Sequence, residues 1–120
     1  MEKQSVNNFR INNNFNLREF QCNCCQQVKL KPLLAEKLQK LREVIDYPIL
    51  VNSGFRCDNH NQRVGGSPSS YHLHGMAADI YVRGKSPEEL LQQAATVGFN
   101  GLGLYNNHLH VDIRPQKVRW

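Results

Sequence analysis

The end of the chain carries alternating polar side chains of types that could do chemistry. His108, His110 and Asp112 are followed at the same spacing by Arg114. Alternate residues of a β-strand share one face, so a strand over residues 108–113 would gather these side chains and turn the intervening apolar residues to the core. A solvated surface strand is the alternative interpretation. Two imidazoles, a carboxylate and a guanidinium in a row favour a functional site.

A second group of potential metal ligands, His72, His74 and Asp79, precedes this strand. Catalytic zinc takes three protein ligands, commonly histidine nitrogens and a carboxylate oxygen, and leaves one position for water. His72, Asp79 and His110 would supply such a set without thiolates. The sequence therefore predicts one Zn²⁺ per chain. His74 is interpreted as a surface histidine or as a residue that supports a ligand.

The four cysteines are unevenly distributed. Cys22, Cys24 and Cys25 lie in one loop, and Cys57 directly follows Arg56. An even number would allow two disulfides, and a Cys-x-Cys-Cys cluster with a fourth thiol could hold a structural zinc. The N-terminus lacks the pattern of a secretory signal. For a chain without such a signal, the default expectation is that the cysteines are made as thiols in a reducing compartment. Disulfides, free thiols and a second zinc are all compatible with the sequence.

Capping residues and apolar periodicity predict three helical segments. The first is a short turn that ends at Phe20, and it is preceded by Asn16 with Glu19 three residues later, the pattern of a capping box. The second helix starts at Pro32 and has an apolar stripe at intervals of four, three and four residues. The third follows Ser86, which has a proline next and a glutamate at the third position.

Four apolar segments predict strands, at residues 48–55, 77–82, 102–105 and 108–113. The last two are separated by Asn106-Asn107, a pair that tolerates the positive φ of a tight hairpin turn. The fold class expected is α+β, with helices packed on a small, mostly antiparallel sheet. The polar stretch 57–75 is predicted to be one long loop, and loops of that length in small domains are usually functional.

Length and composition fit one compact domain. The chain has 120 residues, of which 40% are hydrophobic and 21% charged. Residues 1–14, with five asparagines, predict a loose N-terminal arm, and residues 15–120 the domain. No apolar run approaches the ~18 residues of a membrane-spanning helix. The net charge of +5 suits an anionic partner, but the basic residues are scattered and no motif that reads nucleic acid accompanies them.

The motifs occur together in an order that resembles a known family, the zinc D-Ala-D-Ala carboxypeptidases. The resemblance rests on Ser53-Gly54-Phe55-Arg56, Asn61, Gly65-Gly66, Ser70-x-His72-x-x-Gly75-x-Ala77-x-Asp79 and His108-x-His110-x-Asp112. This family is grouped with lysostaphin-type enzymes and the hedgehog domain. The likeness covers residues 15–120 and is strongest to the compact form in phage lysins and bacterial wall peptidases. It implies a hedgehog/D-Ala-D-Ala peptidase-like fold.

The resemblance also implies roles for individual residues. His72, Asp79 and His110 match the zinc ligands of the family. Arg56 matches an arginine that faces the scissile carbonyl, where a fixed cation would stabilise an oxyanion and bind substrate. Ser70 matches a serine whose hydroxyl supports a ligand or the substrate.

The general base is the least determined role. Asn107 stands where the D-Ala-D-Ala dipeptidases have a catalytic carboxylate, and asparagine cannot accept a proton. Asp112 and His108 are the candidates, and for Asp112 catalysis is favoured over a role in orienting a ligand imidazole. Tyr71 is expected to line the substrate cleft, and Trp120 to serve packing.

The function expected is hydrolysis of a D-amino-acid-containing bond in a bacterial peptidoglycan stem peptide, by a monomeric zinc carboxypeptidase or endopeptidase. Without a signal-like N-terminus, we expect synthesis in the cytoplasm and action at the cell wall, with a phage or prophage origin. The alternatives are a zinc-retaining wall-binding module without turnover, and a phage structural component.

Overall fold

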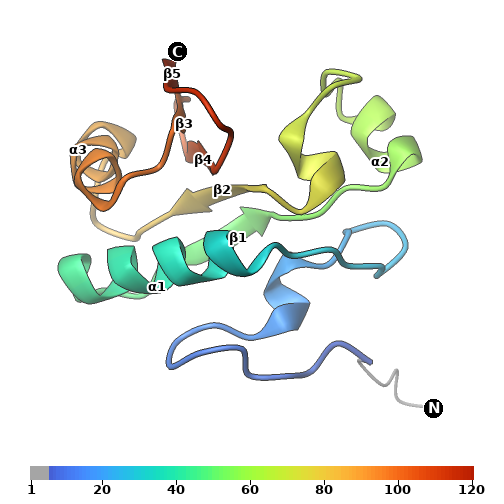
Figure 1. Cartoon of the computed structure of the whole chain (residues 1–120), viewed down its shortest axis with the longest axis horizontal. Helices are drawn as coiled ribbons and strands as arrows, with labels where there is room; N and C mark the ends of the chain where they lie inside the picture. Colours follow the sequence, from blue (N-terminus) through green and yellow to red (C-terminus); the bar gives the residue numbers. More distant parts are fainter. Residues whose placement is uncertain (1–5) are drawn as a thin grey trace.

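One five-stranded sheet organises the chain in the computed structural model, which describes residues 6–120 (Figure 1). The strands are Leu50–Ser53 (β1), Ala77–Tyr81 (β2), Gly101–Leu104 (β3), Leu109–Asp112 (β4) and Val118–Arg119 (β5). Their order across the sheet is β1-β2-β4-β3-β5, and all neighbours are antiparallel except β3 and β5. The expected α+β class is confirmed. Across residues 6–120, no helix combines the length and the apolar character needed to cross a membrane.

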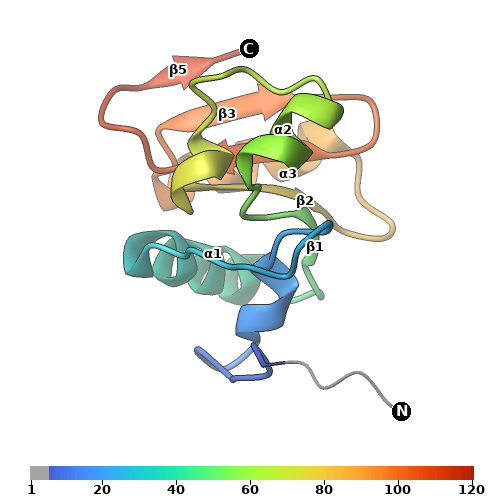
Figure 2. The ribbon, with the colours of Figure 1, turned by 90° about the vertical axis from the view of Figure 1, so that its right-hand side faces the viewer.

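Two amphipathic helices, α1 (Pro32–Ile45) and α3 (Pro87–Val97), cover one face of this sheet. Figure 2 shows α3 behind the sheet and the short helices α2 (Asp58–Arg63) and η2 (Tyr71–His74) in front of it. The core between sheet and helices includes Phe20, Leu34, Leu38, Leu41, Ile80, Leu90, Phe99, Leu102, Leu109 and Val111. The other face of the sheet is therefore left for polar side chains.

The two long helices start at residues that the sequence singled out, and each ends at a residue in the left-handed conformation. Pro32 is the first residue of α1, and Asp46 ends it in the left-handed conformation. Ser86 and Glu89 form the predicted capping box of α3, and Gly98 ends that helix with a φ of 102°. Local sequence thus fixes where each helix starts and stops.

The first helical segment is a single 3-10 turn, η1 (Leu17–Phe20). Its capping box is confirmed. The Asn16 side chain accepts a hydrogen bond from the Arg18 backbone N–H, and the Asn16 backbone N–H donates to the Glu19 carboxylate at 2.7 Å. The rings of Phe15 and Phe20 lie 5.9 Å apart, and both are buried. This contact joins the N-terminal part of the chain to the core.

The hairpin of β3 and β4 is present as predicted, although its turn differs. The Tyr105 N–H donates to the carbonyl of His108 at 3.1 Å, which closes a four-residue connection. Neither Asn106 nor Asn107 has a positive φ. Because the connection has four residues, neither asparagine has to adopt the positive φ that a two-residue turn requires.

The stretch 57–75 is not one long loop, which corrects the prediction. It contains α2 and η2. Helix α2 has the sequence Asp-Asn-His-Asn-Gln-Arg, which has no apolar periodicity, and this is why the pattern did not reveal it. Cys57 is its N-cap and accepts from the His60 N–H through its sulfur.

Residues 7–14 make more contacts than a loose arm would, while residues 1–5 of the predicted arm lie outside the described residues. The Asn12 side chain donates to the carbonyl of Ala35 in α1 at 3.2 Å and accepts from the Phe15 N–H at 3.0 Å. Ile11 packs against the hydrophobic core. Part of the predicted arm therefore belongs to the folded body.

This contact yields a stability prediction. Replacing Asn12 by alanine removes these two hydrogen bonds and a third, exposed one from the Asn14 N–H at 3.3 Å; a hydrogen bond of this kind is worth about 1 kcal/mol. We expect a fall in melting temperature of roughly 5–10 °C in a thermal unfolding experiment. The neighbouring exposed Asn13, replaced by alanine, is the matched control and should leave the melting temperature unchanged. Equal melting temperatures of the two variants would mean that the segment is loose after all.

Candidate metal centre

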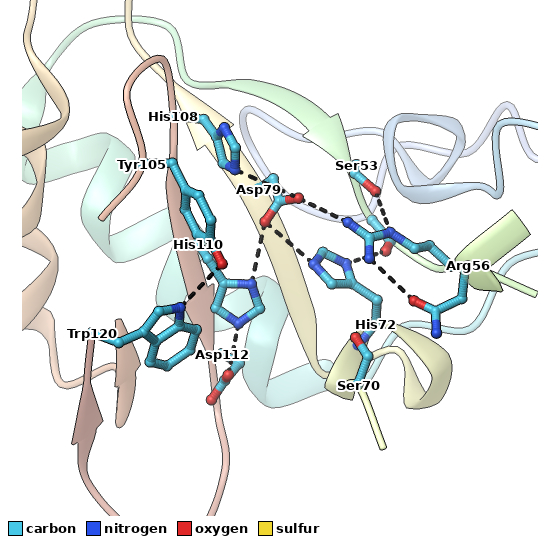
Figure 3. Close-up of polar contacts among 12 residues, drawn as sticks. Ser53, Arg56, Ser70, His72, Asp79, Tyr105, His108, His110, Asp112 and Trp120 are labelled. Atoms are coloured by element: carbon cyan, nitrogen blue, oxygen red, sulfur yellow. Dashed lines mark hydrogen bonds and ion pairs between the residues drawn. The ribbon is translucent and has the colours of Figure 1, made fainter. Parts of the chain in front are cut away.

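Three side chains from different elements converge on the face of the sheet opposite α1 and α3 (Figure 3). His72 comes from η2, Asp79 from β2 and His110 from β4, and all three are buried. Asp79 and His110 are direct partners across β2 and β4, whereas the adjacent Ala78 and Val111 belong to the core. One ligand atom from each of the three lies within 4.8 Å of the others. The structure thus brings the three predicted ligands together.

His72 turns one ring nitrogen to the carboxylate of Asp79. Its Nδ1 lies 2.7 Å from the carbonyl oxygen of Gly54, which can only accept, so Nδ1 carries the hydrogen. In the neutral ring, Nε2 is then a lone pair, and it lies 3.2 Å from Asp79 Oδ1. The turn that holds the ring is capped by the Ser70 hydroxyl, which accepts from the His72 N–H, and is ended by Gly75 at a φ of 69°.

His110 repeats this arrangement from the opposite side. Its Nε2 lies 2.8 Å from Asp112 Oδ2, a carboxylate that Arg114 also contacts through its backbone N–H and its guanidinium. A buried carboxylate at this distance accepts the Nε2 hydrogen, which leaves Nδ1 as the lone pair. That Nδ1 lies 3.2 Å from Asp79 Oδ1. Gly101, on β3, makes the room for Asp112, because a Cβ there would overlap its carboxylate.

The electrostatics of the centre favour charged carboxylates. Burial raises the pKa of Asp79, but the neighbouring imidazoles of His110 and His72 outweigh it and hold that pKa well below its usual value. For Asp112, burial is likewise outweighed by His110 and Arg114, and its pKa is lowered. Burial lowers the pKa of His110, yet its bonds to Asp112 and Asp79 raise it above the usual value. Both carboxylates are therefore anionic at neutral pH.

The donor set fits a divalent metal ion such as zinc. With both imidazoles neutral, two lone pairs face one carboxylate oxygen, an arrangement that needs a cation between them. Ligand atoms about 2.0–2.1 Å from a tetrahedral zinc ion lie about 3.3 Å from each other. The two distances from Asp79 Oδ1 to the imidazole nitrogens, 3.2 Å each, agree with this value.

Arg56 lies beside the carboxylate and is held by three hydrogen bonds. Its Nη2 donates to Asp79 Oδ2 at 3.1 Å, its Nη1 to Asn61 Oδ1 at 3.2 Å, and its Nε to the Ser53 hydroxyl at 3.1 Å. A guanidinium has five N–H groups. Two of them are therefore without a partner among the described residues, although the side chain is fixed in place.

An open pocket of about 720 Å³ lies over the centre. The predicted cleft residues Arg56, Ser70 and Tyr71 line it, as does the glycine and serine segment from Gly65. The lining also includes Val64, His72, Asp79, Tyr105, His108, His110, Arg114, Val118 and Trp120. The candidate ligands are thus reachable by a substrate from one side.

His108, the residue before β4, lines this pocket. Its Nδ1 lies 2.8 Å from the side-chain oxygen of Asn107, and its ring is stacked on Tyr105 with the centroids 4.6 Å apart. Because an amide oxygen only accepts, Nδ1 carries the hydrogen and Nε2 is a lone pair. This Nε2 lies 3.9 Å from Asp79 Oδ2.

Two predicted residues lie elsewhere. Asp112 is fully buried behind His110, does not line the pocket, and has its oxygens engaged by His110 and Arg114. Its position does not suit the predicted role of general base and suits the alternative, orienting His110. His74 is exposed at the end of η2 and is not one of the grouped ligands, in agreement with its interpretation as a surface residue.

Sequence reasoning missed the part that Trp120 plays in the pocket. Its ring lies 5.0 Å from that of His110, and its Nε1 donates to the Tyr105 hydroxyl at 3.1 Å. The guanidinium of Arg114 lies 4.9 Å from the same indole. Gly103 leaves space for the ring, because a Cβ there would overlap it. The only sequence signal was an aromatic residue that follows Lys117 and Arg119, which does not reveal that β5 pairs with β3.

Comparison with known proteins gives two matches. A sequence model of the family described as Peptidase M15 matches residues 9–112. The chain is also 40% identical over 81 residues to a protein of Streptomyces albus G named zinc D-Ala-D-Ala carboxypeptidase. This match covers 62% of the present chain and 32% of the Streptomyces protein, so the chain spans about a third of that relative's length.

Proposed function

Because this chain belongs to the peptidase M15 family, we propose that it is a zinc peptidase that hydrolyses a D-amino-acid-containing bond in peptidoglycan stem peptides. The observation that carries the proposal is the pair of imidazole lone pairs that face one oxygen of Asp79 beneath an open pocket. The name of the Streptomyces relative supports the substrate class. We place the action of the chain at the bacterial cell wall.

His72, Asp79 and His110 would hold the zinc ion through Nε2, Oδ1 and Nδ1. When bound, zinc supplies Lewis acidity, which polarises the scissile carbonyl and acidifies a water molecule. Asp112 acts as a positioning residue, since it fixes the tautomer of His110 and is itself held by Arg114.

His108 is proposed as the general base. Asn107 fixes its tautomer, so that Nε2 accepts the proton of the attacking water and afterwards gives it to the leaving amine. Asparagine could not do this itself, but at this position it determines which nitrogen of its neighbour is free. The catalytic carboxylate of the related dipeptidases is thereby replaced by an amide and an imidazole.

Arg56 is proposed to stabilise the oxyanion. Its guanidinium is fixed by Ser53, Asn61 and Asp79 and retains two N–H groups for the carbonyl oxygen of the substrate. Tyr71 and Trp120 would form the walls of the cleft, with Ser70 at its floor beside His72. The net charge of +5 suits a substrate that carries carboxylates.

The decisive experiment is digestion of purified peptidoglycan by the zinc-loaded chain. We expect new amino groups to appear, and mass spectrometry of the products would separate free D-alanine, the product of a carboxypeptidase, from cleaved cross-links. Removal of zinc with a chelator, or the substitution His110→Ala, should stop the release. Zinc binding without any hydrolysis would instead support the non-catalytic wall-binding module.

The contact that holds Arg56 against Asn61 gives a further prediction. A Cβ on Gly66 would overlap the Asn61 side-chain oxygen and come within 3.0 Å of Arg56 Nη1. The substitution Gly66→Ala should therefore displace the guanidinium and lower kcat/KM by roughly 10–100-fold, with the zinc content unchanged. Arg63→Ala, an exposed change in α2, serves as the control. Unchanged kinetics in Gly66→Ala would show that the Asn61 contact does not matter for turnover.

A further inference from the structure

A second cluster of potential metal ligands lies outside the pocket. This cysteine cluster consists of Cys22, Cys24 and Cys25, in the loop after η1, and Cys57, the N-cap of α2. The four sulfur atoms all lie within 4.8 Å of one another, and all four thiols are free. Residues 32 or more positions apart in sequence are thus brought to one point.

The spacing of the sulfur atoms is that of ligands around an ion. Cys22 and Cys24 are 3.6 Å apart, Cys22 and Cys57 3.7 Å, and Cys24 and Cys57 3.3 Å. Sulfurs bound at about 2.3 Å to a tetrahedral zinc ion lie about 3.8 Å apart. A disulfide would instead bring two of them to about 2.05 Å and leave the others unmatched.

The backbone around the cluster is arranged for thiolates. The Cys57 N–H points to the sulfur of Cys22 at 3.5 Å, and the His60 N–H points to that of Cys57 at 3.4 Å. Such N–H groups stabilise negative sulfur and orient metal ligands. The loop is closed by the bond from the Cys22 N–H to the Gln27 carbonyl at 2.7 Å and by Gln26, which has a φ of 65°.

We propose that the cysteine cluster binds a structural zinc ion, separate from the ion in the pocket. Four thiolates complete a tetrahedral shell and leave no position open for water, which is the character of a structural site. The content would then be two zinc ions per chain, in place of the one that the histidine and aspartate set requires.

The position of Cys57 gives this ion a function in the peptidase. Cys57 directly follows Arg56, and it caps the helix that supplies Asn61 to the same guanidinium. The ion would therefore tie the N-terminal loop to the segment that positions Arg56. The bond from the Phe55 N–H to the Phe20 carbonyl at 2.8 Å joins the same two segments.

The test is a count of zinc in the unmodified chain and in four variants after loading with excess zinc and dialysis. We expect two ions in the unmodified chain, one in Cys24→Ser, one in His110→Ala and none in the double variant. Asn23→Ser, an exposed change in the same loop, is the matched control and should keep two. An unchanged zinc content in Cys24→Ser would overturn the proposal.

A second measurement does not depend on whether the cysteine variant folds. Cobalt-loaded His110→Ala should show the intense near-ultraviolet charge-transfer absorption of cobalt thiolates. Absence of that absorption from folded, cobalt-loaded and fully reduced protein would overturn the proposal. The variants also distinguish the two sites. A zinc content that His110→Ala does not change would contradict the site in the pocket without contradicting the site in the cysteine cluster.

Discussion

Substitution of Asp79 by asparagine is expected to remove the zinc ion of the pocket and to abolish peptidoglycan hydrolysis. The side chain keeps its size but loses its negative charge. The carboxylate oxygens of Asp79 lie 3.1 Å from the Arg56 guanidinium and 3.2 Å from each of the two imidazole nitrogens. A neutral amide can no longer balance a divalent ion between the two lone pairs. Zinc content and turnover, measured on the same preparation, should fall together, the content by one ion per chain.

Asp112→Asn is the matched control, since it changes the same residue type two positions from His110. It weakens the orientation of that imidazole without removing a ligand, so zinc affinity should fall by about 10–100-fold and be rescued by excess zinc. If Asp79→Asn retained full zinc content, or if Asp112→Asn lost it beyond rescue, the assignment of ligand and positioning residue would be reversed.

The metal set was predictable because its signals are local. His72 and Asp79 are fixed by the turn and strand that their own neighbours specify, and strand alternation places His110 on the polar face. Strand alternation predicts on which face of the sheet Asp112 lies, but it does not predict that the side chain is buried. Its burial depends on the absence of a side chain at Gly101, its partner across the sheet, and on the Arg114 side chain, which folds back onto its carboxylate.

The features that sequence did not predict depend on long-range contacts or lack an apolar pattern. Trp120 reaches the pocket because β5 runs parallel to β3, where the Leu104 N–H donates to the Trp120 carbonyl at 2.8 Å. Helix α2 is polar throughout and is stabilised by a cysteine cap instead of an apolar stripe. Asn12 reads as part of a disordered polar segment until its bond to Ala35 is seen.

The substitution His108→Ala is expected to lower kcat by about 10²–10⁴-fold, the usual contribution of a general base. Zinc content should change little because His108 is not among the grouped ligands, and KM should change little because a general base acts in the transition state and not in substrate binding. Steady-state kinetics on a soluble stem peptide would separate kcat from KM. Retention of full activity would mean that the proton is taken by another group.

Asn107 provides the companion variant that separates proton transfer from simple packing. Asn107→Ala leaves the imidazole stacked on Tyr105 but frees its tautomer, so we expect a loss of kcat that is smaller than in His108→Ala. Combining the two substitutions should cost no more than His108→Ala alone, because Asn107 acts only through that ring. Additive losses would show that Asn107 contacts the substrate directly, and the base would then have to be assigned anew.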